Sequence, residues 1–133
     1  MTNQITYALD EANKLLPWLR KRLEEIALAH SDLERFQKRV SVAQKRSQSN
    51  GHRDIGNEIS AIEMQVVTQM KRIKQLIDSL SEKQIEIRDV NSGLVDFPSI
   101  RQGQKIWLCW CKDEREIAFW HPWDTGFTNR QPL

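Results

Sequence analysis

The stretch Lys105-Ile106-Trp107-Leu108-Cys109-Trp110-Cys111 decides the fold class, because six consecutive apolar residues in a strand place apolar side chains on both faces. Ile106, Leu108 and Trp110 fall on one face, and Trp107, Cys109 and Cys111 fall on the other. A strand with one hydrated face would alternate with polar residues, so both faces of this strand need a cover. We expect helices to cover one face, and a second subunit or the chain's own residues 122–133 to cover the other. A binding groove is the alternative explanation for the second face.

The flanking sequence predicts the neighbouring strands. Residues 84–89 alternate in polarity, residues 94–97 follow Gly93 and precede Pro98, and residues 116–121 come after a turn at 112–115. We therefore expect an α+β protein with a small antiparallel sheet of three to four strands within residues 83–133.

Two long helices are expected before the sheet. Apolar residues recur with alternating spacings of four and three, a heptad pattern that brings them onto one side of a helix. The first series is Ala12, Leu16, Leu19, Leu23, Ile26, His30, Leu33, Gln37 and Val40, and the second is Ile55, Ile59, Ile62, Val66, Gln69, Ile73, Leu76 and Leu80. Between them lies a polar stretch with an Asn50-Gly51 turn signal. We predict a long antiparallel two-helix hairpin, similar to a coiled coil, over residues 7–82.

Some residues in the helical region depart from the simple pattern. His30, Gln37 and Gln69 are polar seam residues, which we interpret as register pins between the two helices. A metal ligand or pH switch at His30 is the less favoured alternative. Pro17 predicts a kink or a late helix start, because proline removes a helical hydrogen bond. Thr6 or Asp10 is the expected N-terminal cap.

Length and composition indicate one domain of residues 1–133, with the hairpin at 7–82 and the aromatic-rich β unit and C-terminal tail at 83–133. Charged residues make up 29% and hydrophobic residues 39%, which argues against disorder and against a membrane protein. The first six residues lack the basic start and apolar core of a signal peptide, so we expect a cytoplasmic protein. A thin hairpin buries little surface, so we expect a homo-oligomer, most simply a dimer.

Cys109 and Cys111 lie two residues apart in a predicted strand, which suits neither a disulfide framework nor a zinc ribbon. We favour small buried hydrophobic residues over a reactive or ligand role.

Basic charge is concentrated around the predicted hairpin turn, where no acidic residue occurs between Arg35 and Arg53. Such a cluster could bind nucleic acid, anionic lipid or an acidic protein. A solvated turn is the favoured interpretation, because Phe36 is the sole aromatic residue among the basic ones and no nucleic-acid motif occurs. The candidate contacts are Arg35, Lys38, Arg39, Lys45, Arg46 and Arg53.

Polar residues among the C-terminal aromatic residues are the candidates for chemistry. Asp96, His121 and Asp124 have side chains suited to a divalent transition metal, and an aspartate with His121 could make a general base. No H-E-x-x-H, Gly-rich phosphate loop or G-x-S-x-G motif occurs. The favoured alternative is structural: Asp96 caps a turn, Arg130 makes an ion pair and His121 donates a hydrogen bond.

The two ends of the chain resemble the prokaryotic domain-of-unknown-function family 2203. The resemblance is carried by Tyr7-Ala8-Leu9-Asp10-Glu11-Ala12-Asn13-Lys14-Leu15-Leu16-Pro17, Gly93-Leu94-Val95-Asp96-Phe97-Pro98, Leu108-Cys109-Trp110, Trp120-His121, Gly126-Phe127 and Pro132. The usual Phe-Thr of the family is Tyr7-Ala8 here, and a usual Gly before the first strand is Gln84. The resemblance implies a helix-then-sheet layout and no assigned activity. Its patterned residues map onto Asp89, Asp96, Trp110, Trp120, His121, Gly126 and Arg130, and all of these except Gly126 are our ligand-binding candidates.

Three functions follow from these patterns. The preferred one is a non-catalytic oligomeric interaction or scaffold protein with an unidentified protein partner and no cofactor. The alternative is a metal- or small-ligand-binding protein, enzymatic or not, with its site among Asp89, Asp96, His121 and Arg130. Nucleic-acid binding through the basic turn comes last, because it rests on charge alone.

Overall fold

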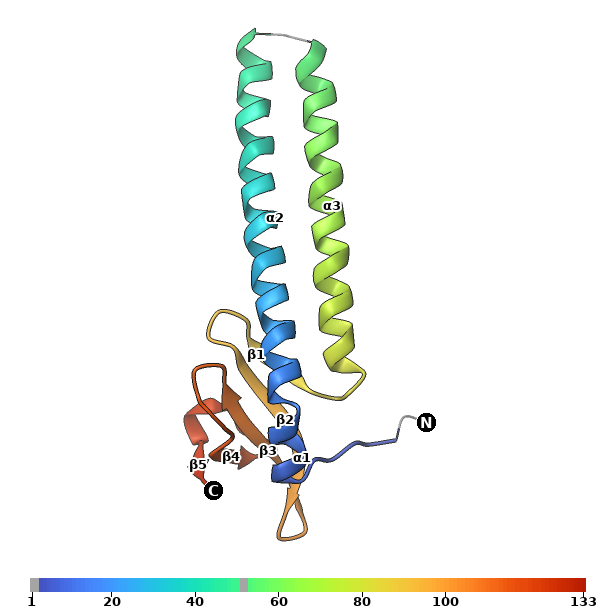
Figure 1. The fold of residues 1–133 in the computed structure, drawn as a ribbon. Helices are drawn as coiled ribbons and strands as arrows, with labels where there is room; N and C mark the ends of the chain where they lie inside the picture. Colours follow the sequence, from blue (N-terminus) through green and yellow to red (C-terminus); the bar gives the residue numbers. More distant parts are fainter. Residues whose placement is uncertain (1–2, 51–52) are drawn as a thin grey trace. The chain divides into compact units, whose positions relative to one another are not determined.

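The computed structural model describes residues 3–50 and 53–133, and it confirms an α+β protein (Figure 1). The side chains of residues 48–50 and 53–54 are not described, so the predicted Asn50-Gly51 turn and the Arg53 side chain lie outside the described residues. No helix in the described part of the chain is long and apolar enough to cross a membrane. The elements are α1 (Leu9–Lys14), α2 (Leu16–Asn50), α3 (Arg53–Ser81), β1 (Glu86–Asp89), β2 (Leu94–Arg101), β3 (Gln104–Cys111), β4 (Phe119–Pro122), the 3-10 helix η1 (Phe127–Asn129) and β5 (Gln131–Pro132).

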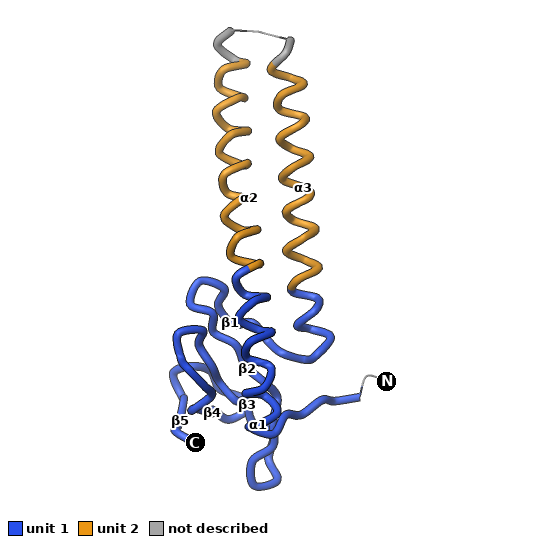
Figure 2. Tube along the Cα trace, viewed as in Figure 1, with its two compact units in different colours: residues 1–24, 77–133 blue, residues 25–76 orange. Residues whose placement is uncertain are grey.

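The chain forms two compact units (Figure 2). Unit 1 consists of Met1–Glu24 and Ile77–Leu133, so it holds the sheet together with α1, the start of α2 and the end of α3. Unit 2 is Glu25–Leu76 and contains most of both long helices. The sequence analysis placed the boundary between the helical hairpin and the β unit between residues 82 and 83, whereas the boundaries of the compact units lie within α2 and α3.

The first helix breaks before Pro17, as its sequence predicts. α1 ends at Lys14 and α2 begins at Leu16, with Leu15 as the C-cap between them. Pro17 therefore lies in the first turn of α2, where a missing backbone N–H is tolerated. The predicted caps were wrong: Ala8 is the N-cap, and its N–H donates to Glu11 Oε1 at 3.0 Å.

The sheet has five antiparallel strands in the order β1-β2-β3-β4-β5, not the three to four that the sequence predicts. The additional strand, β5, has only two residues and contains Pro132, so alternation could not reveal it. β2 also continues through Pro98, which was expected to end it. Proline is tolerated there because β1 pairs with β2 only as far as Asp96, which leaves the edge open beyond that point.

One face of the sheet packs on the helical part of unit 1. Leu16 and Leu19 of α2 join a buried cluster with alternating residues of the central strands, including Phe97, Leu108 and Trp110. These three side chains are at most 2% exposed. The prediction that helices cover one face of the aromatic strands is thus confirmed.

The chain's own tail covers the other face. The Trp123 ring stacks on Trp107 with centroids 4.0 Å apart and an interplanar angle of 8°. The Arg130 guanidinium lies 4.2 Å from the centre of the Phe119 ring. Trp107 is consequently 7% exposed, and Cys109 is fully buried. Of the two covers expected for this face, the tail is the one present, so the face does not require a second subunit.

Unit 2 consists of two antiparallel helices. Arg46 Nη1 near the end of α2 lies 3.7 Å from Glu58 Oε1 near the start of α3. The predicted seam of α3 holds, with Ile55, Ile62 and Leu76 buried.

After Ile26 the predicted seam of α2 holds at Leu33 and Val40, which are half-buried, but it is wrong at its two polar positions, His30 and Gln37. Ala29 is buried, whereas His30 is exposed and its Nδ1 lies 3.6 Å from Glu34 Oε1 on the same helix. Gln37 is also exposed, so neither residue pins the register. The earlier part of the seam packs in unit 1 and the later part in unit 2. The buried face of α2 can therefore point in a different direction around the helix axis in each unit.

Gln84 adopts a left-handed backbone conformation with φ 58°, the region that favours glycine. This explains why glycine suits the position before the first strand. Its side chain compensates here, since Oε1 accepts from the Ile5 N–H at 3.0 Å and Nε2 donates to Asn3 O at 2.7 Å. Through these two hydrogen bonds, Gln84 holds residues 3–5 against the rest of unit 1.

Gly93 and Gly103 offer a matched test of backbone strain. Both have positive φ, 66° and 78°, but a Cβ at Gly93 would lie 2.7 Å from the Lys112 Cβ, whereas a Cβ at Gly103 meets nothing within 4 Å. We expect Gly103→Ala to lower the free energy of unfolding by about 1 kcal/mol, because alanine is strained at positive φ. Gly93→Ala should cost about 1 kcal/mol more, because overpacking against Lys112 adds to the same strain. Urea denaturation measures both. Equal losses would contradict the close approach at Gly93.

Candidate metal and ligand site

Three strands bring a carboxylate, a thiol and an imidazole together on the tail-covered face of the sheet. Asp96 of β2 pairs with Cys109 of β3, and His121 of β4 pairs with the neighbouring Trp107. One potential ligand atom from each of Asp96, Cys109 and His121 lies within 4.8 Å of the other two. All three residues are at most 1% exposed. We call these residues the Asp-Cys-His cluster.

Hydrogen bonds fix the His121 ring. Its Nδ1 lies 3.0 Å from Pro122 O and its Nε2 lies 2.9 Å from Asp96 Oδ2. A carbonyl oxygen only accepts, so Nδ1 carries a hydrogen. The carbonyl of Pro122 therefore orients the ring, and Nε2 faces the Asp96 carboxylate.

The Asp96 carboxylate is buried with its two oxygens in different situations. Oδ2 receives the Arg88 Nε–H at 3.0 Å and also faces His121, whereas Oδ1 is buried without a hydrogen-bond partner. A buried carboxylate oxygen without a donor is costly, because it loses its hydration without compensation. Asp96 therefore has an acceptor position to offer to a cation or a ligand.

Cys109 is a neutral thiol at ordinary pH. Burial, and after it the negative charge of Asp96, raises the pKa of Cys109 to about 12, against an opposing effect of Arg130. Cys111 is half-buried, and burial followed by the charge of Glu114 raises its pKa as well. Neither cysteine is disulfide-bonded.

A cavity of about 350 Å³ borders the cluster. Asp96 and Cys109 contribute to its wall, with apolar side chains and the polar turn that follows β4. Its lining is Arg88, Leu94, Asp96, Cys109, Trp123, Asp124, Thr125, Gly126 and Phe127. This is a volume suited to a small molecule.

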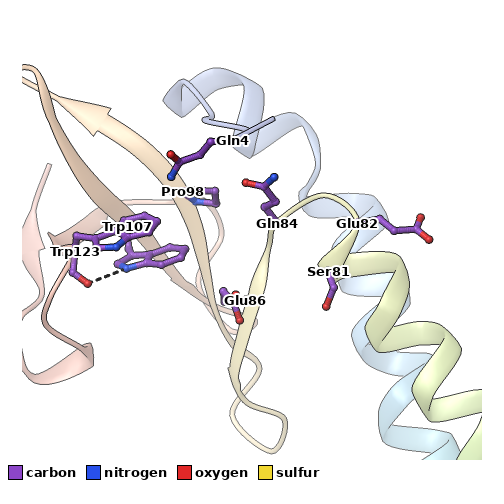
Figure 3. Close-up of a pocket in the computed structure, with 8 residues that line it drawn as sticks. All are labelled: Gln4, Ser81, Glu82, Gln84, Glu86, Pro98, Trp107 and Trp123. Carbon is purple, nitrogen blue, oxygen red and sulfur yellow. Dashed lines mark hydrogen bonds between the residues drawn. The ribbon is translucent and has the colours of Figure 1, made fainter. Parts of the chain in front are cut away.

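A larger cavity of about 740 Å³ lies nearby in unit 1 and shares Trp123 with the smaller one (Figure 3). In Figure 3 the Trp107 Nε1–H donates to Trp123 O, at 3.1 Å, so this stacked pair forms one wall. Its lining includes the carboxylates of Glu82 and Glu86 but no member of the Asp-Cys-His cluster. The chemistry is therefore concentrated at the smaller cavity.

The structure brings together only some of the sequence-predicted site residues. Asp96 and His121 meet, whereas Asp124 is exposed at the rim of the smaller cavity. Asp89 is the last residue of β1, and its Oδ2 accepts the hydroxyl hydrogen of Ser92 in the following turn at 2.8 Å. Arg130 pairs with Glu114 at 2.6 Å and donates to Cys109 O at 3.2 Å, so it supports the cluster from the side.

The two candidate tryptophans belong to the helix-covered face. Trp110 is fully buried, and its Nε1–H donates to Glu114 O at 3.0 Å. Trp120 packs against the same core, with the Arg101 guanidinium 4.9 Å from its ring centre. Both lie on the opposite side of the sheet from the Asp-Cys-His cluster.

The basic residues of α2 lie apart from this site, in unit 2. Arg35, Lys38, Arg39 and Arg46 line one hollow together with Glu58. The Arg35 and Arg39 guanidiniums lie 5.6 and 5.8 Å from the Phe36 ring centre, so this aromatic ring is already in contact with cations. The preference against nucleic-acid binding stays a prediction.

Sequence reasoning missed Cys109 and Arg88 as members of the site. Cys109 was interpreted as a small buried hydrophobic residue, and its burial is confirmed. Its closeness to Asp96 depends on the β2–β3 register, which one sequence does not specify. Arg88 gave a weak signal as a polar position in an alternating strand.

Comparison with protein families gives one match, to the model described as "Uncharacterized conserved protein (DUF2203)", over residues 6–133. The resemblance seen in the motifs is therefore confirmed over nearly the whole chain. Comparison with curated proteins and with solved structures gives no match in either set.

Asp96→Asn should cost about 3 kcal/mol of unfolding free energy, because it removes the only negative group that faces both His121 and Arg88 among the described contacts. Asp124→Asn is the matched control, since Asp124 is exposed and makes no described hydrogen bond or ion pair. Chemical denaturation measures both. A loss of less than 1 kcal/mol for Asp96→Asn would refute a tightly coupled network.

Cys109 should resist alkylation in the folded, chelator-treated protein at pH 8. Its folded pKa of about 12 exceeds an unfolded value of about 8.5. The neutral thiol thus contributes stability that is complete below the unfolded pKa and is lost as pH rises toward 12. Peptide mapping after iodoacetamide treatment should show Cys111 labelled first and Cys109 labelled only after urea unfolding. Equal native labelling of the two cysteines would contradict this protection.

Proposed function

We propose that this chain, which belongs to the DUF2203 family, binds a divalent transition metal through Asp96, Cys109 and His121. The observation that carries the proposal is the buried meeting of three different donor atoms within 4.8 Å of one another. Imidazole nitrogen, thiolate sulfur and carboxylate oxygen are the donors that Zn²⁺ takes in proteins.

The surroundings of the donors support this proposal. Metal-binding histidines usually donate their second ring N–H to a backbone carbonyl or carboxylate, as His121 Nδ1 does to Pro122 O. Arg88 holds Oδ2 of Asp96, while Oδ1 has no partner and is available as a ligand.

Three protein donors leave one tetrahedral position of Zn²⁺ open. The cavity of about 350 Å³ lies on the side of Asp96 and Cys109, where a small ligand could reach that position. Bound metal supplies Lewis acidity there. The chain's residues provide orientation of the donors and exclusion of bulk water.

The metal proposal replaces the scaffold as the preferred function. The scaffold hypothesis relied on the heptad pattern of the helices and on a sheet face that needed a partner, and Trp123 and Arg130 of the tail cover that face, which weakens its second support. We retain the expectation of a cytoplasmic protein, for which two free cysteines are typical.

Metal titration tests the proposal directly. Chelator-treated protein should bind one Co²⁺ or Zn²⁺ per chain, and Co²⁺ should show a thiolate-to-metal absorption band with tetrahedral ligand-field intensity. Cys109→Ser should weaken binding by about 100-fold or more, since loss of a ligand exceeds the loss caused by an outer-shell change.

Cys111→Ser is the matched control, because Cys111 lies two residues away on the same strand and outside the cluster. It should retain the stoichiometry and the thiolate band. No stoichiometric binding by the wild type, or equal loss in both serine variants, would overturn the metal site.

A further inference from the structure

The exposed side of α3 carries apolar side chains that unit 2 leaves uncovered. Met64, Val67 and Met70 are 71%, 50% and 55% exposed. With Glu63 and Lys71, which flank them, we call these residues the α3 stripe. Exposed methionine-rich surfaces are typical of contact sites, because the flexible thioether adapts to a partner.

The α3 stripe is separate from the seam between the two helices. Ile62 is buried and Val66 is partly buried in the seam, whereas the next residue, Val67, is 50% exposed. Each residue turns an α-helix by about 100°, so Val67 points well away from the direction of Val66. The helix thus has a second apolar side that its neighbour within unit 2 does not cover.

The core of unit 2 is small for its length. The buried hydrophobic residues described within Glu25–Leu76 are Ile26, Ala29, Ala43, Ile55, Ile62 and Leu76, and two of these are alanines. A helical pair with so little buried volume gains stability when another helix pair packs against it. This favours a folded helical partner over a small molecule.

Charge on the α3 stripe is self-complementary. Glu63 lies four residues before Val67 and Lys71 lies four residues after it, about 6 Å away in each direction along the helix. If a second copy packed antiparallel with Val67 at the centre, each Glu63 would lie level with the partner's Lys71. A parallel copy would place like charges level with each other, which is unfavourable.

We propose that the protein forms a two-fold symmetric dimer in which the α3 stripes of two copies pack antiparallel around Val67. The contact is isologous, so each subunit contributes the same acid and the same base. This inference does not depend on the metal site, since all of its residues lie in unit 2.

Charge reversal with a heterodimer rescue tests the proposal. Sedimentation analysis of the full chain should show a wild-type dimer, and Glu63→Lys or Lys71→Glu alone should each raise the dimer dissociation constant by roughly 10-fold or more, because each places two like-charge pairs at the contact. An equimolar mixture of the two variants should dimerise again, since one chain then carries two lysines and the other two glutamates.

Arg72→Glu is the matched control, because it makes the same charge change one residue away from Lys71 and outside the α3 stripe. It should leave dimerisation unchanged, and circular dichroism should show all variants equally helical. A monomeric wild type at all concentrations tested would overturn the proposal. So would single variants that dimerise like the wild type, or a mixture that fails to recover.

Discussion

The central constraint on this protein is that β3 has apolar side chains on both faces and must be covered twice. Leu16 and Leu19 of α2 cover the first face, and Trp123 and Arg130 of the tail cover the second. The second cover has a chemical consequence, because it also buries every polar side chain that β2 and β4 place on that face. Asp96 and His121 are buried for this reason.

A buried carboxylate survives only if nearby groups compensate for its lost hydration. His121 and Arg88 do so at one oxygen of Asp96, while the other oxygen lacks a donor. A purely structural network would be expected to satisfy both oxygens. The incomplete satisfaction, next to a thiol and a cavity, is what distinguishes this cluster from an ordinary buried ion pair.

The location of uncovered apolar surface also changes where we expect two copies of the chain to associate. The sheet was the expected contact when its second face seemed open, but the tail closes that face. Uncovered apolar area is found instead on α3, around Val67. The two proposals, metal binding and association, therefore concern different parts of the chain, the first in unit 1 and the second in unit 2.

Local patterns in the sequence determined much of the secondary structure. Heptad spacing predicted both long helices, Pro17 predicted the early break, and alternation predicted the main strands. Each of these features depends on residues close together in the chain, where spacing alone fixes which side chains share a face. The sequence also placed Asp96 and His121 among its candidate site residues, but together with Asp89, Asp124 and Arg130, which do not join the cluster.

The tertiary structure decided the rest, because it depends on contacts between residues far apart in the chain. The β2–β3 register brought Cys109 to Asp96, and a shift of one residue would have placed it on the other face. Packing in two units moved the α2 seam from His30 to Ala29. A single sequence shows local spacing, but it does not show the strand register or which segment covers each face of the sheet. The candidate site depends on both.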